Sequence, residues 1–214
     1  MNGKGHALTA TLGWFAAAPL AAQALHHPIG RWELAAGGLV AAGAGMLPDI
    51  DHPGATAART FGPFGRAVAK AVSKVARGHR GRTHRISFAI TAGLGTAWSA
   101  SHWSWGAAVV TAVVAAWAWR QLGPDLRLEV IRCDVDAIVA GTAAGVATFV
   151  WLTPGWWLPA AVAAGALVHL AGDRLFGNRL VRVDGPIERV VVWALSMALP
   201  VVVLVQCGVL IPAP

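Results

Sequence analysis

The sequence predicts an all-α protein: a polytopic membrane helix bundle of about six to seven apolar helices, with one short amphipathic helix at the membrane interface. Hydrophobic residues make up 56% of the 214 residues and charged residues only 13%, with a mean hydropathy of +0.58. A soluble domain usually carries about twice that charged fraction. The apolar residues also fall in long runs that are poor in charge, which is typical of membrane helices.

The apolar runs define seven expected spans. Several of them are shorter than the roughly 20 residues that a perpendicular span needs, which implies tight helix packing or local thinning of the bilayer. Glycine and alanine dominate their interiors, and these small residues allow helices to approach closely. The whole chain, 1–214, is therefore expected to form a single integral membrane domain with one long cytoplasmic loop at 49–85. The spans are 7–25, 34–47, 86–101, 103–119, 137–153, 156–171 and 189–211.

The first span has one alternative interpretation. Lys4, an apolar run and Ala22-Gln23-Ala24 together resemble a secretory signal with an A-x-A cleavage site. Cleavage would remove His6 and leave the new N-terminus outside the membrane. We favour an uncleaved span because the charge distribution fits a first helix that stays in place.

Basic residues are divided unequally between the predicted loops. With these spans, sixteen of the 17 lysines and arginines fall on one side and only Arg31 falls on the other. The positive-inside rule makes the basic side cytoplasmic. Topology thus explains the formal charge of +7, so we expect no nucleic-acid partner. The opposite turns are rich in tryptophan, as in the aromatic belt of a membrane protein.

The loop at 49–85 contains the expected amphipathic helix. Its apolar residues repeat at helical spacing and its basic residues fall on another face. Such a helix is suited to lie on an anionic cytoplasmic leaflet, so membrane lipids are expected partners, although a solvated cap over the helix ends fits the same pattern. The two faces consist of Phe64, Val68, Val72 and Val75, and of Arg66, Lys70, Lys74 and Arg77.

Residue types that bind metals collect on the predicted cytoplasmic side. They comprise five histidines and three aspartates: His6, Asp49, Asp51, His52, His79, His84, His169 and Asp173. Pro48 should end the second span near Leu47, because proline disfavours helix at the preceding residue. The segment 49–52 then forms a turn whose two carboxylates and one imidazole can bind one divalent ion or bridge two. A solvated helix end is the alternative.

The second cluster lies in the basic segment 78–85. Thr83 is expected to cap the third span at its N-terminus, which puts His84 in the first helical turn. Free backbone amides there, together with Arg80 and Arg82, would suit a phosphate or carboxylate. A basic loop that merely follows the positive-inside rule is the alternative.

The third cluster is His169 and Asp173, four residues apart and hence on one helix face. They could be two ligands of one ion, or a ligand and the residue that orients it. An ion pair at the helix end is the alternative. In the preceding loop, Asp134 and Asp136 are expected to cap the next helix.

These motifs resemble the bacterial membrane-bound metal-dependent hydrolase family, which includes a LexA-regulated inner-membrane protein. The likeness covers roughly residues 1–175 and rests on His6, Leu-Pro-Asp-Ile-Asp-His at 47–52, His-Arg-Gly-Arg-Thr-His at 79–84 and the 169/173 pair. It implies a multi-pass protein of the inner (plasma) membrane with metal-dependent hydrolase activity. The chain departs from the family at Arg85, where serine is usual, and after Asp173, where a Thr-Pro/Gly turn is usual. Both departures concern the substrate pocket more than the metal site.

The expected function is hydrolysis at the cytoplasmic membrane face by one or two divalent ions, with zinc expected first and manganese or iron as alternatives. Asp49 or Asp51 would bridge the ions or act as the catalytic base. Arg80 and Arg82 would bind an anionic group of a phospholipid or another phosphate ester. A metal or proton transporter is less favoured, because transporters hold ionisable groups near mid-membrane. A non-catalytic membrane protein is the third hypothesis.

Overall fold

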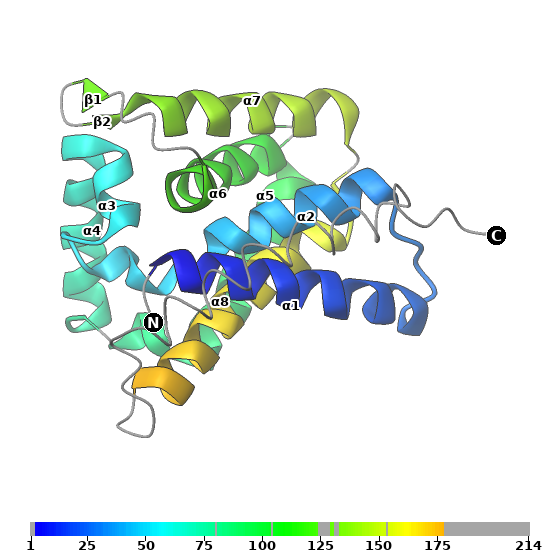
Figure 1. Cartoon of the computed structure of the whole chain (residues 1–214), viewed down its shortest axis with the longest axis horizontal. Coiled ribbons are helices and arrows are strands. Elements are labelled where there is room, and N and C mark those ends of the chain that lie inside the picture. Colours follow the sequence, from blue (N-terminus) through cyan, green and yellow to red (C-terminus); the bar gives the residue numbers. More distant parts are fainter. Residues whose placement is uncertain are drawn as a thin grey trace.

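The computed structural model describes residues 3–79, 81–103, 105–123, 129–130, 133–152 and 154–177. It is almost entirely helical there, which confirms the all-α prediction (Figure 1). The long helices are α1 (Gly3–Ala24), α2 (Arg31–Ala44), α5 (Ile86–His102), α6 (Gly106–Leu122), α7 (Val135–Trp151) and α8 (Trp157–Gly177). Shorter elements are η1 (Pro48–Asp51), α3 (Thr56–Thr60), α4 (Gly62–Ala76), η2 (Arg82–His84) and an antiparallel pair of two-residue strands, β1 (Glu129–Val130) and β2 (Cys133–Asp134).

Each of the first six expected spans overlaps one long helix, whereas the span predicted at 189–211 lies outside the described residues. None of the described helices combines the length and the apolar character that crossing a membrane requires. α2 has 14 residues and α5, α6 and α7 have 17 each, against about 20 for a perpendicular span. The structure therefore supports these six segments as helices.

α2 is the central helix of the bundle and contacts α1, α6 and α8. Large side chains from these helices form the main core, with Trp14 and Trp117 among them. The indole of Trp14 donates a hydrogen bond to the carbonyl of Leu34, and that of Trp117 donates to the carbonyl of Ala57. A side chain at Gly43 would overlap the backbone of Val114, so the small residue allows α2 and α6 to touch.

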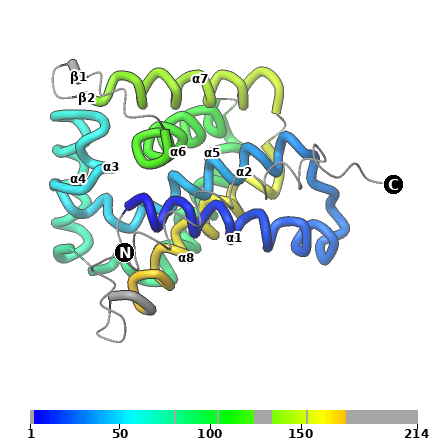
Figure 2. The backbone as a smooth tube through the Cα atoms, in the orientation of Figure 1, coloured from blue at the N-terminus to red at the C-terminus, as the bar shows by residue number. Residues whose placement is uncertain are grey.

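The short elements gather at one end of the bundle. α3 and α4 run across the ends of the long helices, and the N-terminus of α1 lies at this same end (Figures 1 and 2). α4 contacts α3, η1 and η2. The C-terminal end of α2 leads into η1, and η2 leads into α5. This arrangement gathers four segments that are far apart in the sequence.

One predicted helix cap is wrong, and another is confirmed in its position only, with Asp136 in the first turn of α7 as expected. α5 begins at Ile86 after Arg85, and Thr83 lies instead in η2, where its hydroxyl donates to Asp51 rather than to the start of α5. Asp134 does hold the N-cap position of α7, but without a side-chain cap hydrogen bond. Its carboxylate instead pairs with Arg120 at 2.8 Å. In both cases a side-chain partner from another element replaces the free helix amides.

Candidate metal centre

Five of the eight candidate ligands lie together at this end of the bundle, in two groups of three that share His169: His6, His169 and Asp173, and Asp49, His84 and His169. They come from four elements: His6 from α1, Asp49 from η1, His84 from η2, and both His169 and Asp173 from α8. The three imidazoles present their Nε2 atoms to the two carboxylates. In Figure 2 the start of α1 lies beside the end of α8, which is where His6 meets Asp173.

The distances between these atoms are those of ligands around an ion. His6 Nε2 lies 3.3 Å from Asp173 Oδ1, and His84 Nε2 lies 3.6 Å from Asp173 Oδ2. His169 Nε2 lies 3.7 Å from Asp49 Oδ1. Direct N–H···O hydrogen bonds are shorter, about 2.7–3.2 Å. Two ligands that each lie about 2.1 Å from a tetrahedral zinc ion are about 3.4 Å apart. The cluster therefore has the dimensions of a coordination shell.

The hydrogen bond on the other nitrogen sets the tautomer of His169. Its Nδ1 lies 2.6 Å from the carbonyl oxygen of Gly45, which can only accept, so Nδ1 carries the proton. In the neutral imidazole, Nε2 then has a lone pair directed into the cluster. The side chain is 1% exposed, so this lone pair is removed from bulk water.

A chain of two hydrogen bonds fixes the tautomer of His84 in the same way. The hydroxyl of Thr83 donates to Asp51 Oδ2 at 2.5 Å, so its oxygen accepts from His84 Nδ1 at 3.2 Å. His84 Nε2 is thereby also left as an acceptor. Among the described residues, the Nε2 atoms of His84 and His169 are buried without a hydrogen-bond partner. Buried polar atoms are seldom left so, because the desolvation cost is about 1–3 kcal/mol each. A bound cation would satisfy both.

The charge state of Asp49 also suits a cation. Burial alone would raise the pKa of its carboxyl, but the interaction with the His84 imidazole and the nearby His169 and His6 together lower the pKa below the ordinary value. Asp49 is therefore ionised at neutral pH. Its side chain is 30% exposed, compared with 14% for Asp173. The cluster is thus most accessible from the side of Asp49.

Three candidate ligands lie outside this cluster. Asp51 is fully buried, and its two carboxylate oxygens are held by His79 Nδ1 at 3.0 Å and by the Thr83 hydroxyl. The side chain of His79 is 41% exposed, and its ring centroid lies 5.4 Å from that of His84. His52 is exposed, packs edge-on against His79 and accepts a hydrogen bond from the amide of Gly54. Metal binding by these three residues stays a prediction.

Of the two arginines predicted to bind an anion, the structure describes only Arg82. Arg82 is exposed in η2, before α5 begins, so it does not flank a helix N-terminus at Thr83 as the sequence suggested. Arg80 lies outside the described residues. Anion binding by either arginine stays a prediction.

Two groups that orient the ligands were not predicted from the sequence. One is the Thr83 hydroxyl, which was interpreted as a helix cap; its position directly before His84 is the signal for the role it has in the structure. The other is the carbonyl of Gly45, which meets His169 only through the packing of α2 against α8. A backbone carbonyl has no sequence signature of its own.

Comparison with known proteins gives one match. No curated protein and no solved structure matches the chain. The family of YdjM inner membrane proteins matches residues 1–180, a range that contains all eight candidate ligands. This match covers most of the chain. The chain belongs to the YdjM inner membrane protein family.

Proposed function

We propose that this protein is a membrane-bound hydrolase that uses one or two divalent ions, held by His6, Asp49, His84, His169 and Asp173, to cleave a phosphate or carboxylic ester of a membrane lipid. The observation that carries the proposal is the convergence of three Nε2 atoms on two carboxylates. Imidazole and carboxylate ligands suit zinc first, and also manganese or iron. A bound ion of this kind would lower the pKa of a water molecule and polarise an ester oxygen.

The residues of the chain divide into three roles in this proposal. Four residues act only as ligands of the cation: His6, His84, His169 and Asp173. Asp49 is the fifth ligand and has a second role. Asp49, the most exposed of the five and ionised at neutral pH, is the residue suited to accept a proton from an attacking water. Asp51 was the other candidate base, but its oxygens are already engaged and it has no exposed surface. We therefore assign Asp51 to positioning Thr83 and His79.

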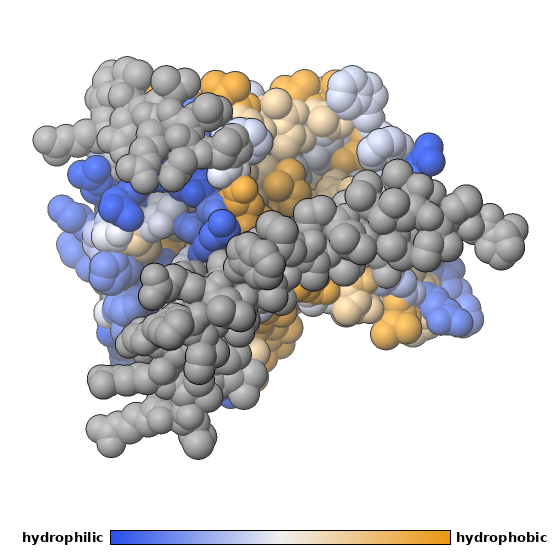
Figure 3. Space-filling view, viewed as in Figure 1, coloured by the Kyte–Doolittle hydropathy of each residue, from blue (hydrophilic) through white to orange (hydrophobic). Residues whose placement is uncertain are grey.

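Apolar residues on the outer faces of the helices support a location within the bilayer. On α5, Ile86, Ile90, Leu94 and Trp98 recur every four residues and are 51–66% exposed. α7 exposes Val139, Val146, Phe149 and Val150 in the same way. On the face shown in Figure 3, hydrophilic residues gather over α3 and α4 on the left, and apolar residues are visible to the right of them. Exposed apolar patches of this kind normally contact lipid or protein. We propose that the bundle is multi-pass and that its basic end, with the metal centre, faces the cytoplasm.

A test of this function starts from protein purified in detergent and stripped with a chelator. Stoichiometric zinc, manganese or iron is then restored, and hydrolysis is followed with nitrophenyl phosphates, nitrophenyl carboxylates and mixed phospholipid micelles. We expect one of these metals to restore turnover on at least one ester class. Metal binding without any hydrolysis would contradict the enzyme proposal, and metal flux through proteoliposomes would favour the transporter.

The relay from Asp51 through Thr83 gives a second test. Thr83→Val keeps the shape of the side chain but removes the hydroxyl that holds Nδ1 of His84. We expect metal affinity to fall about 10–100-fold, the usual effect of losing a residue that orients a ligand. Metal titration of the purified variant measures this.

Thr91→Val is the matched control for that experiment. Thr91 is exposed and its hydroxyl bonds only to the carbonyl of Ser87 within α5 in the described structure. Its loss should leave metal affinity unchanged. Equal affinity in the Thr83 and Thr91 variants would show that the relay does not position His84.

A further inference from the structure

α4 has three distinct faces. Small residues pack it onto the protein: Gly62, Gly65, Ala69 and Ala76 are buried. A second face is apolar but turned outward, with Phe64 73% and Val75 69% exposed. Helical spacing puts Lys70 and Lys74 on the third, basic face, and both are exposed. Two of the four large apolar residues of the helix are thus exposed, while Val68 and Val72 are half-buried.

This exposed face lies at the edge of the proposed membrane-embedded bundle. α4 crosses the ends of the long helices at the end where the metal centre forms (Figure 1). A helix in this position lies along a membrane surface when the bundle stands across the bilayer. Its charge is complementary to an anionic leaflet, because Arg66, Lys70, Lys74 and Arg77 all belong to this segment.

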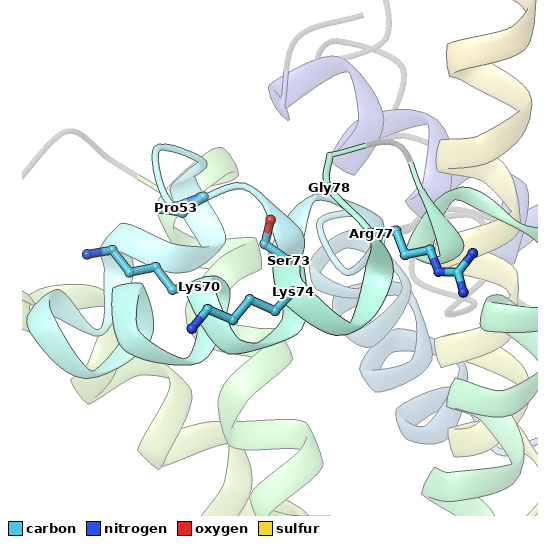
Figure 4. A pocket seen from close by; sticks show the side chains of 6 residues that line it. All are labelled: Pro53, Lys70, Ser73, Lys74, Arg77 and Gly78. Carbon is cyan, nitrogen blue, oxygen red and sulfur yellow. The ribbon is translucent and has the colours of Figure 1, made fainter.

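The basic face also borders a hollow of about 480 Å³. Figure 4 shows Lys70 and Lys74 directed to the same side, with the hydroxyl of Ser73 close by and Arg77 directed away. Pro53 and Gly78 complete its lining, next in sequence to His52 and His79. Two ammonium groups and a hydroxyl are donors suited to a phosphate oxygen. A headgroup held here would lie next to the turns that carry His52 and His79, the two histidines outside the cluster.

We propose that α4 is an interfacial helix that docks on an anionic phospholipid surface. Phe64 and Val75 enter the boundary between headgroups and acyl chains, while Lys70 and Lys74 extend along their apolar stems to reach the lipid phosphates. The inference does not depend on the hydrolase proposal, since it requires only a lipid surface. For a lipid-cleaving enzyme, it would in addition bring headgroups to the side of the centre where Asp49 is exposed.

The experiment uses the full chain in nanodiscs of phosphatidylcholine, with or without about one quarter phosphatidylglycerol. Cys133 and Cys207 are replaced by serine, and one cysteine is introduced by Phe64→Cys or Val75→Cys for an environment-sensitive fluorophore. In anionic discs we expect blue-shifted emission at both positions and quenching by lipid-borne nitroxides. Quenching should exceed that of the matched label at Lys70→Cys at least about twofold, because that position lies on the basic face.

Charge reversal separates anionic recognition from general lipid contact. Lys70→Glu with Lys74→Glu should reduce the nitroxide quenching at position 64 at least about twofold in anionic discs. Unchanged metal content would show that the variant is folded. If a water-soluble quencher still quenches the fluorophores at positions 64 and 75 in anionic discs, the proposal is overturned. Quenching that is as strong in zwitterionic discs, or in the charge-reversed variant, as in the original protein in anionic discs would also overturn it. A label that is shielded by a second copy of the protein, without any nitroxide quenching, would overturn it as well.

Discussion

Asp173→Asn should remove most of the bound divalent metal from the purified protein while the helices remain folded. The two oxygens of Asp173 face different histidines: Oδ1 lies 3.3 Å from His6, and Oδ2 lies 3.6 Å from His84 and 3.8 Å from His169. Asparagine has the same shape but no charge, and it replaces one oxygen by an amide nitrogen that cannot bind a cation. We expect affinity to fall by at least about 100-fold, beyond the range for residues that only orient a ligand.

Elemental analysis of the detergent-purified variant measures this loss, and metal-restored hydrolysis should disappear with it. Asp134→Asn is the matched control, because Asp134 is also a largely buried carboxylate but pairs with Arg120 rather than with the centre.

His84→Gln should behave as Asp173→Asn does. His52→Gln, at an exposed position outside the cluster, should keep the metal. Full metal content in the Asp173 variant would exclude it as a ligand.

The helices could be predicted from the sequence because their signal is local. Uninterrupted apolar runs located the six long described helices, and Pro48 correctly marked the end of α2, with η1 following it. Whether these helices cross a bilayer is not a local property. It depends on which faces stay exposed, and the row Ile86, Ile90 and Leu94 could be recognised as exposed only after α5 had been packed against α8.

The set of candidate ligands could be predicted in part. Residue type and position at helix ends indicated His6, Asp49 and the pair on α8, and the structure places these residues in two adjoining groups that share His169. The same criteria also selected Asp51, which the fold directs toward Thr83 and His79 instead. In a turn of only four residues, neighbouring side chains diverge, and the direction of each depends on backbone angles that the composition of the turn does not encode.

Removing the metal should lower the thermal stability of the whole protein. The ligands come from α1, η1, η2 and α8, so bound metal adds links among segments that otherwise share only packing and a few hydrogen bonds, such as those of Thr83 to Asp51 and of His169 to Gly45. A ligand present at 100 times its Kd stabilises the folded state by about 2.7 kcal/mol. For a chain of this size, 1 kcal/mol corresponds to roughly 2–4 °C in Tm. We therefore expect a chelator to lower Tm by roughly 5–10 °C, measured by scanning fluorimetry in detergent.

The Tm difference between metal-loaded and stripped protein should depend on pH in a way that identifies the ligands. Imidazoles bind metal only when unprotonated, so protons should compete with the ion as the pH falls. Asp49 has a lowered pKa, so its contribution to stability is lost only as the pH falls through that value, below its ordinary 3.8. The Tm difference between metal-loaded and stripped protein should thus disappear while Asp49 is still ionised. A Tm difference that stayed unchanged down to the pH at which Asp49 itself becomes protonated would mean that carboxylates alone hold the ion and that the three histidines do not bind it.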